Sequence, residues 1–143
     1  MKSLRTLVAG AALAAAMGAT NSLPAHAADA PAPRADVGVR AEGLMKAWYN
    51  VNYINLCGYW AGSSYNWGDC WNTASSLWND RYPGVNDDVW VHWGLNCQKA
   101  RRGVYNGVYL ANLSQWRFDQ GTGQGSGELL DNNIASHCVT QLP

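Results

Sequence analysis

Four cysteines are the residues in this 143-residue chain whose chemistry is most constrained by their number. An even count in a small exported domain indicates disulfides, and four cysteines allow three pairings among which the sequence does not choose. Zinc is the alternative, but no two cysteines have CxxC spacing and few histidines accompany them. We expect two disulfides, one in each half of the domain: Cys57–Cys70 and Cys97–Cys138.

Catalytic patterns are the second kind of chemistry to test. The chain has no HExxH and no GxSxG motif, and the glycine run from Gly121 to Gly127 lacks the ending of a phosphate loop. His92 and His137 are expected to be packed and structural. Acidic residues that could form a glycosidase pair are present, but no spacing singles out two of them: Asp69, Asp87, Asp88, Asp119 and Glu128. We therefore expect no enzymatic activity and no required cofactor.

The N-terminal segment has the features of an export signal. Lys2 and Arg5 precede a short apolar stretch, and Ala25-His26-Ala27 has the small-x-small pattern of a cleavage site. The predicted organisation is a signal peptide at 1–27, a flexible leader at 28–43 and one domain at 44–143. The mature protein is then extracellular and has no membrane anchor. Lys+Arg and Asp+Glu number 10 each, so a nucleic-acid partner is not expected.

The body of the chain is predicted to be all-β. Its aromatic residues are interleaved with Asn, Ser and Gly, which favours short strands and tight turns. Period-two alternation predicts strands at 49–53 and 89–93, and Asn106-Gly107 predicts a hairpin across 103–109. Trp48, Trp78 and Trp93 are expected inside, whereas an exposed row of three tryptophans would favour sugar binding.

An internal repeat divides this body into two halves. The segment Asn72-Thr73-Ala74-Ser75-Ser76 matches Asn133-Ile134-Ala135-Ser136-His137, and Ala47-Trp48 matches His92-Trp93 further upstream. Two similar β units of this size share one core when they pack together.

These motifs resemble the βγ-crystallin fold, in which each Greek-key motif has an aromatic corner and a D/N-D/N-x-x-S/T-S loop. The loops at 71–76 and 132–137 are similar to that pattern. More narrowly, Ala74–Asn79, Asp131–His137, Asn66-Trp67-Gly68 and Ala100-Arg101-Arg102 look like the secreted actinobacterial metalloproteinase-inhibitor family. Lys46 and Cys97 depart from that family, which usually has Cys and an aromatic residue there. The resemblance implies an all-β, two-motif Greek-key sandwich.

The resemblance also implies two kinds of site. In βγ-crystallin-like domains the loops supply oxygen ligands for calcium; here these would be Asn72, Ser75, Asn132, Asn133 and Ser136. The alternative is that these side chains only fix the loop backbone. The inhibitor family implies an exposed loop that docks into an extracellular metallopeptidase. One candidate is 101–109, with Val104 or Val108 filling an apolar pocket, and the other is Trp78–Asp88. The residues proposed for contact are Arg101, Arg102, Val104, Tyr105 and Val108.

The expected function is therefore inhibition of an extracellular peptidase by a monomer. The alternative is a calcium- or carbohydrate-binding βγ-crystallin-like module without inhibitory activity.

Overall fold

The computed structural model describes residues 41–143, and the predicted signal peptide and the leader up to residue 40 lie outside the described residues. The described part contains seven β-strands and four short 3-10 turns but no α-helix. The strands are β1 (Leu44–Trp48), β2 (Leu56–Trp60), β3 (Ser76–Asp80), β4 (Asp88–His92), β5 (Arg101–Val104), β6 (Tyr109–Leu110) and β7 (Ser136–Thr140). The turns are η1 (Val51–Tyr53), η2 (Gly68–Cys70), η3 (Leu95–Cys97) and η4 (Leu113–Gln115).

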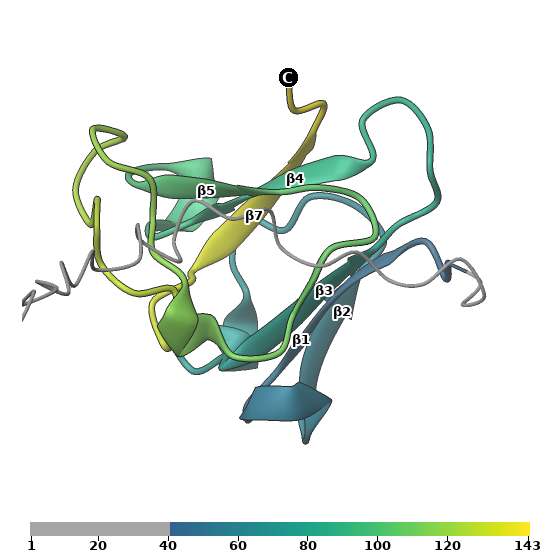
Figure 1. Ribbon diagram of the computed structural model, residues 1–143, viewed down its shortest axis with the longest axis horizontal. Helices are drawn as coiled ribbons and strands as arrows, with labels where there is room; N and C mark the ends of the chain where they lie inside the picture. Colours follow the sequence, from purple (N-terminus) through teal and green to yellow (C-terminus); the bar gives the residue numbers. More distant parts are fainter. Residues whose placement is uncertain (1–40) are drawn as a thin grey trace, which may run out of the picture.

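The strands form two antiparallel sheets that pack face to face (Figure 1). One sheet has the order β2-β1-β3-β6 and the other has the order β5-β4-β7. The fold is therefore the all-β sandwich that the sequence predicts. None of the helical turns in residues 41–143 has the length and apolar character needed to cross a membrane.

Each half of the chain contributes one segment to the sheet of the other half. The second half supplies β6, which pairs with β3 through Leu77 and Leu110. The first half supplies Ser64, which forms a bridge with His137 in β7. This exchange is the Greek-key connection, and it joins the two motifs through backbone hydrogen bonds.

The predicted hairpin at 103–109 is wrong, because β5 pairs with β4 whereas β6 pairs with β3. The intervening chain crosses from one sheet to the other and is tied to the buried residue Asn79. The Asn79 side chain donates to the carbonyl of Val104 at 3.0 Å, and its backbone exchanges hydrogen bonds with Gly107 and Val108. The Asn-Gly signal does mark a turn, since Gly107 has a φ of 74°. That turn serves a crossing between sheets.

The strand predicted at 49–53 is also wrong, since these residues form the corner that contains η1. Asn52 has a φ of 57° and the equivalent Asn96, in η3, has a φ of 56°. Asparagine accepts the left-handed conformation more readily than most residues, so the chain turns there. The strand predicted at 89–93 is confirmed as β4.

Aliphatic side chains, together with Phe118, fill the space between the sheets. Trp48, Trp78 and Trp93, which were expected inside, are only half-buried, and Trp67 is the tryptophan that is buried. The ring of Trp67 stacks on Trp60 with 4.8 Å between centroids. Only Trp71 among the eight tryptophans, all of which the structure describes, is classed as exposed, so an exposed row of three is not found.

Both expected disulfides, Cys57–Cys70 and Cys97–Cys138, are confirmed. The first links β2 to η2 and the second links η3 to β7. The end of the predicted leader is tied to the domain, because Gly43 donates its N–H to the carbonyl of Asp80 at 2.9 Å.

Candidate functional site

The connection between β3 and β4, residues 81–87, is the segment that protrudes on the right of Figure 1. Val85 is 87% exposed, and Tyr82 and Pro83 are exposed as well. At this exposure the Val85 side chain has no packing role within the domain. The connection therefore presents an apolar tip to solvent.

Hydrogen bonds hold this connection on both sides of the tip. The Gly84 N–H donates to the Asp87 carboxylate at 2.8 Å, and the Asn86 N–H donates to the Gln141 side chain at 3.0 Å. The Asn79 amide also donates to the Asp87 carbonyl at 3.0 Å. The loop around Val85 is thus braced by its own residues, by β3 and by the C-terminal segment.

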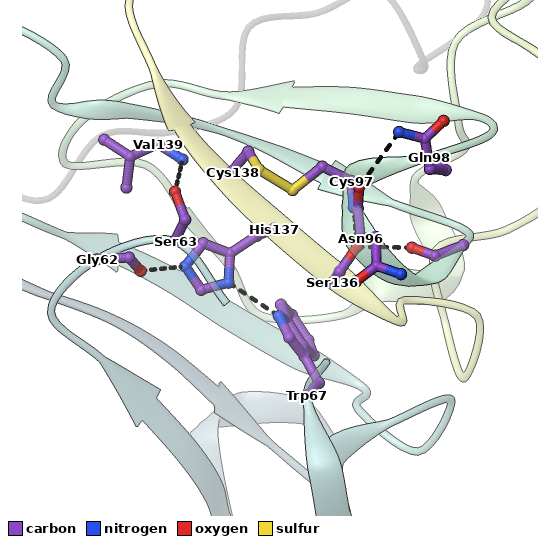
Figure 2. Close-up of a disulfide and its surroundings, with 11 residues drawn as sticks. Gly62, Ser63, Trp67, Asn96, Cys97, Gln98, Ser136, His137, Cys138 and Val139 are labelled. Atoms are coloured by element: carbon purple, nitrogen blue, oxygen red, sulfur yellow. Dashed lines mark hydrogen bonds between the residues drawn. A yellow bond between two sulfur atoms is a disulfide. The ribbon is translucent and has the colours of Figure 1, made fainter. Parts of the chain in front are cut away.

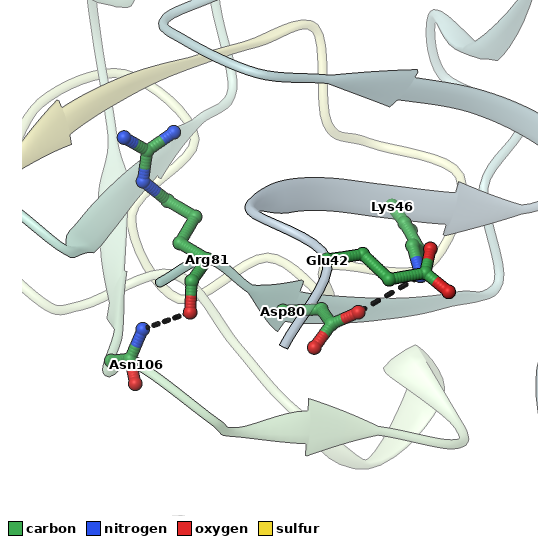
Figure 3. Close-up of polar contacts among 5 residues, drawn as sticks. All are labelled: Glu42, Lys46, Asp80, Arg81 and Asn106. Carbon is green, nitrogen blue, oxygen red and sulfur yellow. Dashed lines mark hydrogen bonds and ion pairs between the residues drawn. The ribbon is translucent and has the colours of Figure 1, made fainter. Parts of the chain in front are cut away.

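The base of the connection is fixed by Arg81 and Asn106 (Figure 3). The Asn106 amide donates to the Arg81 carbonyl at 2.7 Å, and the Arg81 guanidinium donates to the carbonyl of Ala61 at 2.5 Å. The Tyr82 ring lies against Gly43, where a Cβ would come within 2.5 Å of the ring. Glycine is therefore required at position 43 for this ring position.

A chain of ion pairs lies beside this base (Figure 3). The Lys46 ammonium is 2.6 Å from the Glu42 carboxylate and 2.9 Å from the Asp80 carboxylate. Burial lowers the pKa of Lys46, but the hydrogen bonds to Glu42 and Asp80 outweigh it, and the net pKa is raised. The cation therefore stays charged and helps to fix the end of β3.

The residues proposed for the other inhibitory loop do not form one exposed surface. Val104 and Val108 are 1% and 4% exposed and belong to the core, so the prediction that either fills a peptidase pocket is wrong. Arg101 and Tyr105 are exposed, and Arg102 is half-buried, 3.5 Å from Asp119. Both valines lie on the crossing between sheets and are held to the buried Asn79, because the Asn79 side chain donates to the Val104 carbonyl and the Asn79 backbone N–H donates to the Val108 carbonyl.

The two loops proposed for calcium are equivalent in space, but with a different register from the sequence match. The Asn72 N–H donates to the Ile134 carbonyl, and the Asn132 N–H donates to the Ala74 carbonyl, both at 3.0 Å. Asn72 and Asn132 have similar positive φ angles of 54° and 58°. Asn72 is therefore the counterpart of Asn132, one residue before the Asn133 that the sequence match chose.

This register changes the ligand set that the loops offer. The counterpart of Ser75 is Ala135, so the second loop has no hydroxyl at that position. The Ser136 hydroxyl donates to the Gly94 carbonyl at 2.6 Å and accepts from the Cys97 N–H at 3.0 Å, which gives it a structural role. The Asn133 amide donates to the Leu129 carbonyl.

Within residues 41–143, no three His, Cys, Asp or Glu side chains are grouped to hold a metal ion. Calcium can also bind amide and carbonyl oxygens, and calcium binding stays a prediction.

His137 is buried between the sheets next to the second disulfide (Figure 2). The Trp67 indole N–H donates to its Nδ1 at 2.8 Å, and its Nε2 lies 2.8 Å from the Gly62 carbonyl. The first contact requires an unprotonated Nδ1, so Nε2 carries the proton and donates it. Burial is the main cause that lowers the pKa of His137, to about 4. The sequence-based expectation that His137 is structural agrees with these contacts.

The sequence interpretation included Val85 only as part of the alternative segment Trp78–Asp88. The available signal is an isolated β-branched residue within Pro83-Gly84-Val85-Asn86-Asp87, where every neighbour favours a turn. An apolar residue in such a setting is usually exposed, because a tight turn between strands has no buried face.

No family model matches the chain, and no curated protein matches it. Among solved structures, the chain is similar to a domain from work on the evolution of the eye lens βγ-crystallin domain fold. The TM-score is 0.51 at 13% identity, covering 78% of this chain and 98% of that one. The chain also matches a βγ-crystallin from Ciona intestinalis, with a TM-score of 0.49 and 12% identity, covering 68% of this chain and 100% of that one. A third match is the N-terminal domain of protein S, with a TM-score of 0.45 and 16% identity, covering 70% of this chain and 98% of that one. At these identities the first likeness establishes the fold alone: the described domain is βγ-crystallin-like.

Proposed function

We propose that this protein is a secreted peptidase inhibitor that inserts the connection 81–87 into the cleft of an extracellular metallopeptidase. The observation that carries the proposal is the exposure of Val85 at the tip of a loop that is closed by its own Gly84–Asp87 hydrogen bond and tied to the domain through Asn79 and Gln141. The family resemblance of the sequence supports the same class of partner. The two disulfides support an oxidising, extracellular location.

The physical mechanism is pre-organisation. A loop that is already fixed loses little conformational entropy when a protease binds it, so more of the contact energy appears as affinity. Val85 fills the apolar pocket beside the metal of a thermolysin-like enzyme, and Tyr82 packs against the rim. Because Gly84, Asn86 and Asp87 hold the loop in place, cleavage is slow and the bound loop is not released.

The test is an inhibition assay against thermolysin with the purified protein and three variants. Val85→Asp places a charge in the apolar pocket, and we expect inhibition to weaken about thirtyfold, as for the loss of a central contact residue. Val51→Asp is the matched control, since it places the same charge at an exposed valine that lies in η1. Arg101→Gln tests the other loop and is expected to leave inhibition unchanged.

Two results would contradict the proposal. Absence of inhibition of metallopeptidases at micromolar protein would leave a binding module with another partner. Full inhibition by Val85→Asp combined with loss in Arg101→Gln would transfer the contact to the other candidate segment, 101–109.

A further inference from the structure

A second candidate binding site lies at the far end of β4, away from the connection 81–87. Two cations there are held by aromatic rings. The Arg101 guanidinium lies over the Trp90 ring at 4.4 Å from the centroid, and the Lys99 ammonium lies over the Trp93 ring at 4.6 Å. A cation over an indole is attracted by the ring but keeps its full charge. These two side chains are therefore positioned without being neutralised.

The other described cations differ from this pair because they have oxygen partners. Lys46 contacts two carboxylates and Arg102 contacts the Asp119 carboxylate. Arg81 and Arg117 donate to backbone carbonyls. Neither Lys99 nor Arg101 has an ion pair with a carboxylate within residues 41–143, although the chain contains as many acidic as basic residues. The Asp119 carboxylate, which pairs with Arg102, also attracts Arg101 without forming an ion pair with it. The positive charge at this site thus comes from Lys99 and Arg101 and does not reflect a basic protein.

A hollow of ≈ 440 Å³ lies between these side chains, and its lining includes Lys99, Arg101, His92 and Thr122. His92 is only 6% exposed, and its Nδ1 has no hydrogen-bond partner among the described residues. Burial, and then the charge of Arg101, lower the pKa of His92, while carbonyls of Gln98 and Lys99 oppose this. The charge of the Arg101 guanidinium therefore disfavours protonation of the His92 imidazole, and both residues line the same hollow.

The floor of the hollow is fixed by Thr122. Its hydroxyl donates to the Asp119 carbonyl at 2.7 Å and accepts from the backbone N–H of Arg101 at 3.2 Å. This contact sets the position of Arg101 relative to the glycine-rich loop. The hollow is consequently lined by residues of β4, of β5 and of the loop at 121–122, and a hydrogen bond holds that loop to β5.

We propose that this hollow binds a tetrahedral oxyanion, a phosphate or sulfate group, between Lys99, Arg101 and His92. The Lys99 ammonium and the Arg101 guanidinium donate from separate elements and carry several N–H groups, which suits an anion that has oxygens pointing in several directions. Charged hydrogen bonds to such oxygens are the strong kind. An anion would compensate the two cations, and when His92 is protonated the anion would accept a hydrogen bond from the Nδ1 that has no partner among the described residues.

The experiment follows the indole N–H signals of Trp90 and Trp93 by nuclear magnetic resonance, because the two cations lie directly over these rings. Inorganic phosphate, sulfate and dimethyl phosphate are added separately at constant ionic strength. We expect saturable movement of both signals with at least one of the three. Binding of dimethyl phosphate identifies a phosphodiester of a larger molecule as the source, whereas binding of the two inorganic ions alone identifies a free ion or a terminal group.

Variants assign the response to the site. Lys99→Gln and Arg101→Gln each remove one charged donor, and we expect binding to weaken about tenfold. Arg117→Gln is the matched control, since it removes an equal charge from an exposed arginine that does not line the hollow. The proposal is overturned if no anion gives a saturable response, if Lys99→Gln and Arg101→Gln bind as tightly as the parent, or if Arg117→Gln weakens binding equally. Because peptidase inhibition depends on the opposite end of β4, neither result decides the other.

Discussion

The corner after β1 and the corner after β4 have nearly the same backbone. Asn52 and Tyr53 have φ angles of 57° and 62°, and their counterparts Asn96 and Cys97 both have 56°. A serine at the start of a later strand, β3 for the first corner and β7 for the second, completes each corner. Ser76 bridges Asn50 and Tyr53, and Ser136 bridges Gly94 and Cys97, with hydrogen bonds of 2.6 to 3.1 Å.

The side chains that close the two corners differ. Tyr53 packs edge-on against Trp48 and Tyr109, with centroids 5.1 and 6.3 Å apart. Cys97 is bonded to Cys138. One corner is therefore closed by aromatic packing and the other by a covalent bond. The backbone of this turn, more than the side chain over it, therefore defines the motif.

The two halves also differ at the inward position of their last strand. Leu77 in β3 is an ordinary core residue, whereas its counterpart His137 in β7 is a buried imidazole. The hydrogen bonds from Trp67 and to Gly62 make burial of this polar ring tolerable. The second half thus holds a group whose charge depends on pH where the first half holds none.

The largest expected difference between the corners comes from removing the covalent bond. Replacing Cys97 and Cys138 by alanine releases a constraint spanning 41 residues, whereas replacing Cys57 and Cys70 releases one spanning 13. Loop entropy predicts losses of about 4 and about 3 kcal/mol in the free energy of unfolding. Denaturant unfolding at pH 7 measures both. A smaller loss for Cys97 and Cys138 than for Cys57 and Cys70 would contradict the expectation that the longer closed loop gives the covalent corner its larger contribution.

The second prediction concerns pH and distinguishes His137 from Leu77. Because the folded pKa of His137 is about 4 and the unfolded value is 6.5, the unfolded chain binds a proton first as the pH falls. The stabilisation is complete above pH 6.5 and is lost between pH 6.5 and 4. On acidification from pH 8 to pH 4.5, the protonation of this group alone lowers the free energy of unfolding by about 2.5 kcal/mol.

The variant His137→Leu places the residue of the first half in the second. It is expected to be less stable at pH 7, because Trp67 loses its acceptor and Gly62 its donor. From pH 8 to pH 4.5 the variant should lose about 2.5 kcal/mol less of its free energy of unfolding than the parent does. Urea titrations at the two pH values measure this difference. An identical pH profile for both proteins would contradict the assignment.

The smallest expected effects are at Asn52 and Asn96, where the backbones agree. Alanine is penalised in the left-handed conformation, so Asn52→Ala and Asn96→Ala should each cost about 1 kcal/mol. Glycine at either position should cost less, since it has no Cβ. Thermal unfolding measures the four variants. Clearly unequal costs in the two corners would break the equivalence of their backbones.

Much of this fold could be predicted from local sequence. The alternation around Val91 predicts β4, and the even number of cysteines predicts two disulfides, although the sequence does not choose among their three pairings. The aromatic composition predicts the all-β class. These signals depend on neighbours in the chain, on side-chain period and on cysteine chemistry, which a single sequence displays directly.

The errors arise where long-range contacts decide. Asn106-Gly107 is a sound turn signal, but β6 pairs with β3 because the halves exchange strands, and this exchange leaves no local trace. The alternation around Val51 fits a strand as well as a corner, since asparagine suits both an exposed strand position and a left-handed turn. In the two loops proposed for calcium, residue identity pairs Asn72 with Asn133, whereas the backbone pairs Asn72 with Asn132, since both have a positive φ.

The donation of β6 to the first sheet has a consequence for biogenesis. While the ribosome has made only the first half, β3 has no neighbour on the side where Leu110 will pair, and the nascent sheet keeps an open edge. Cys57 and Cys70 are both available before that strand is synthesised, so the nearer cross-link can form while the chain is still incomplete. Closure of the sandwich must wait for contacts distant in sequence, which makes maturation slow and leaves the unfinished half exposed to misassembly.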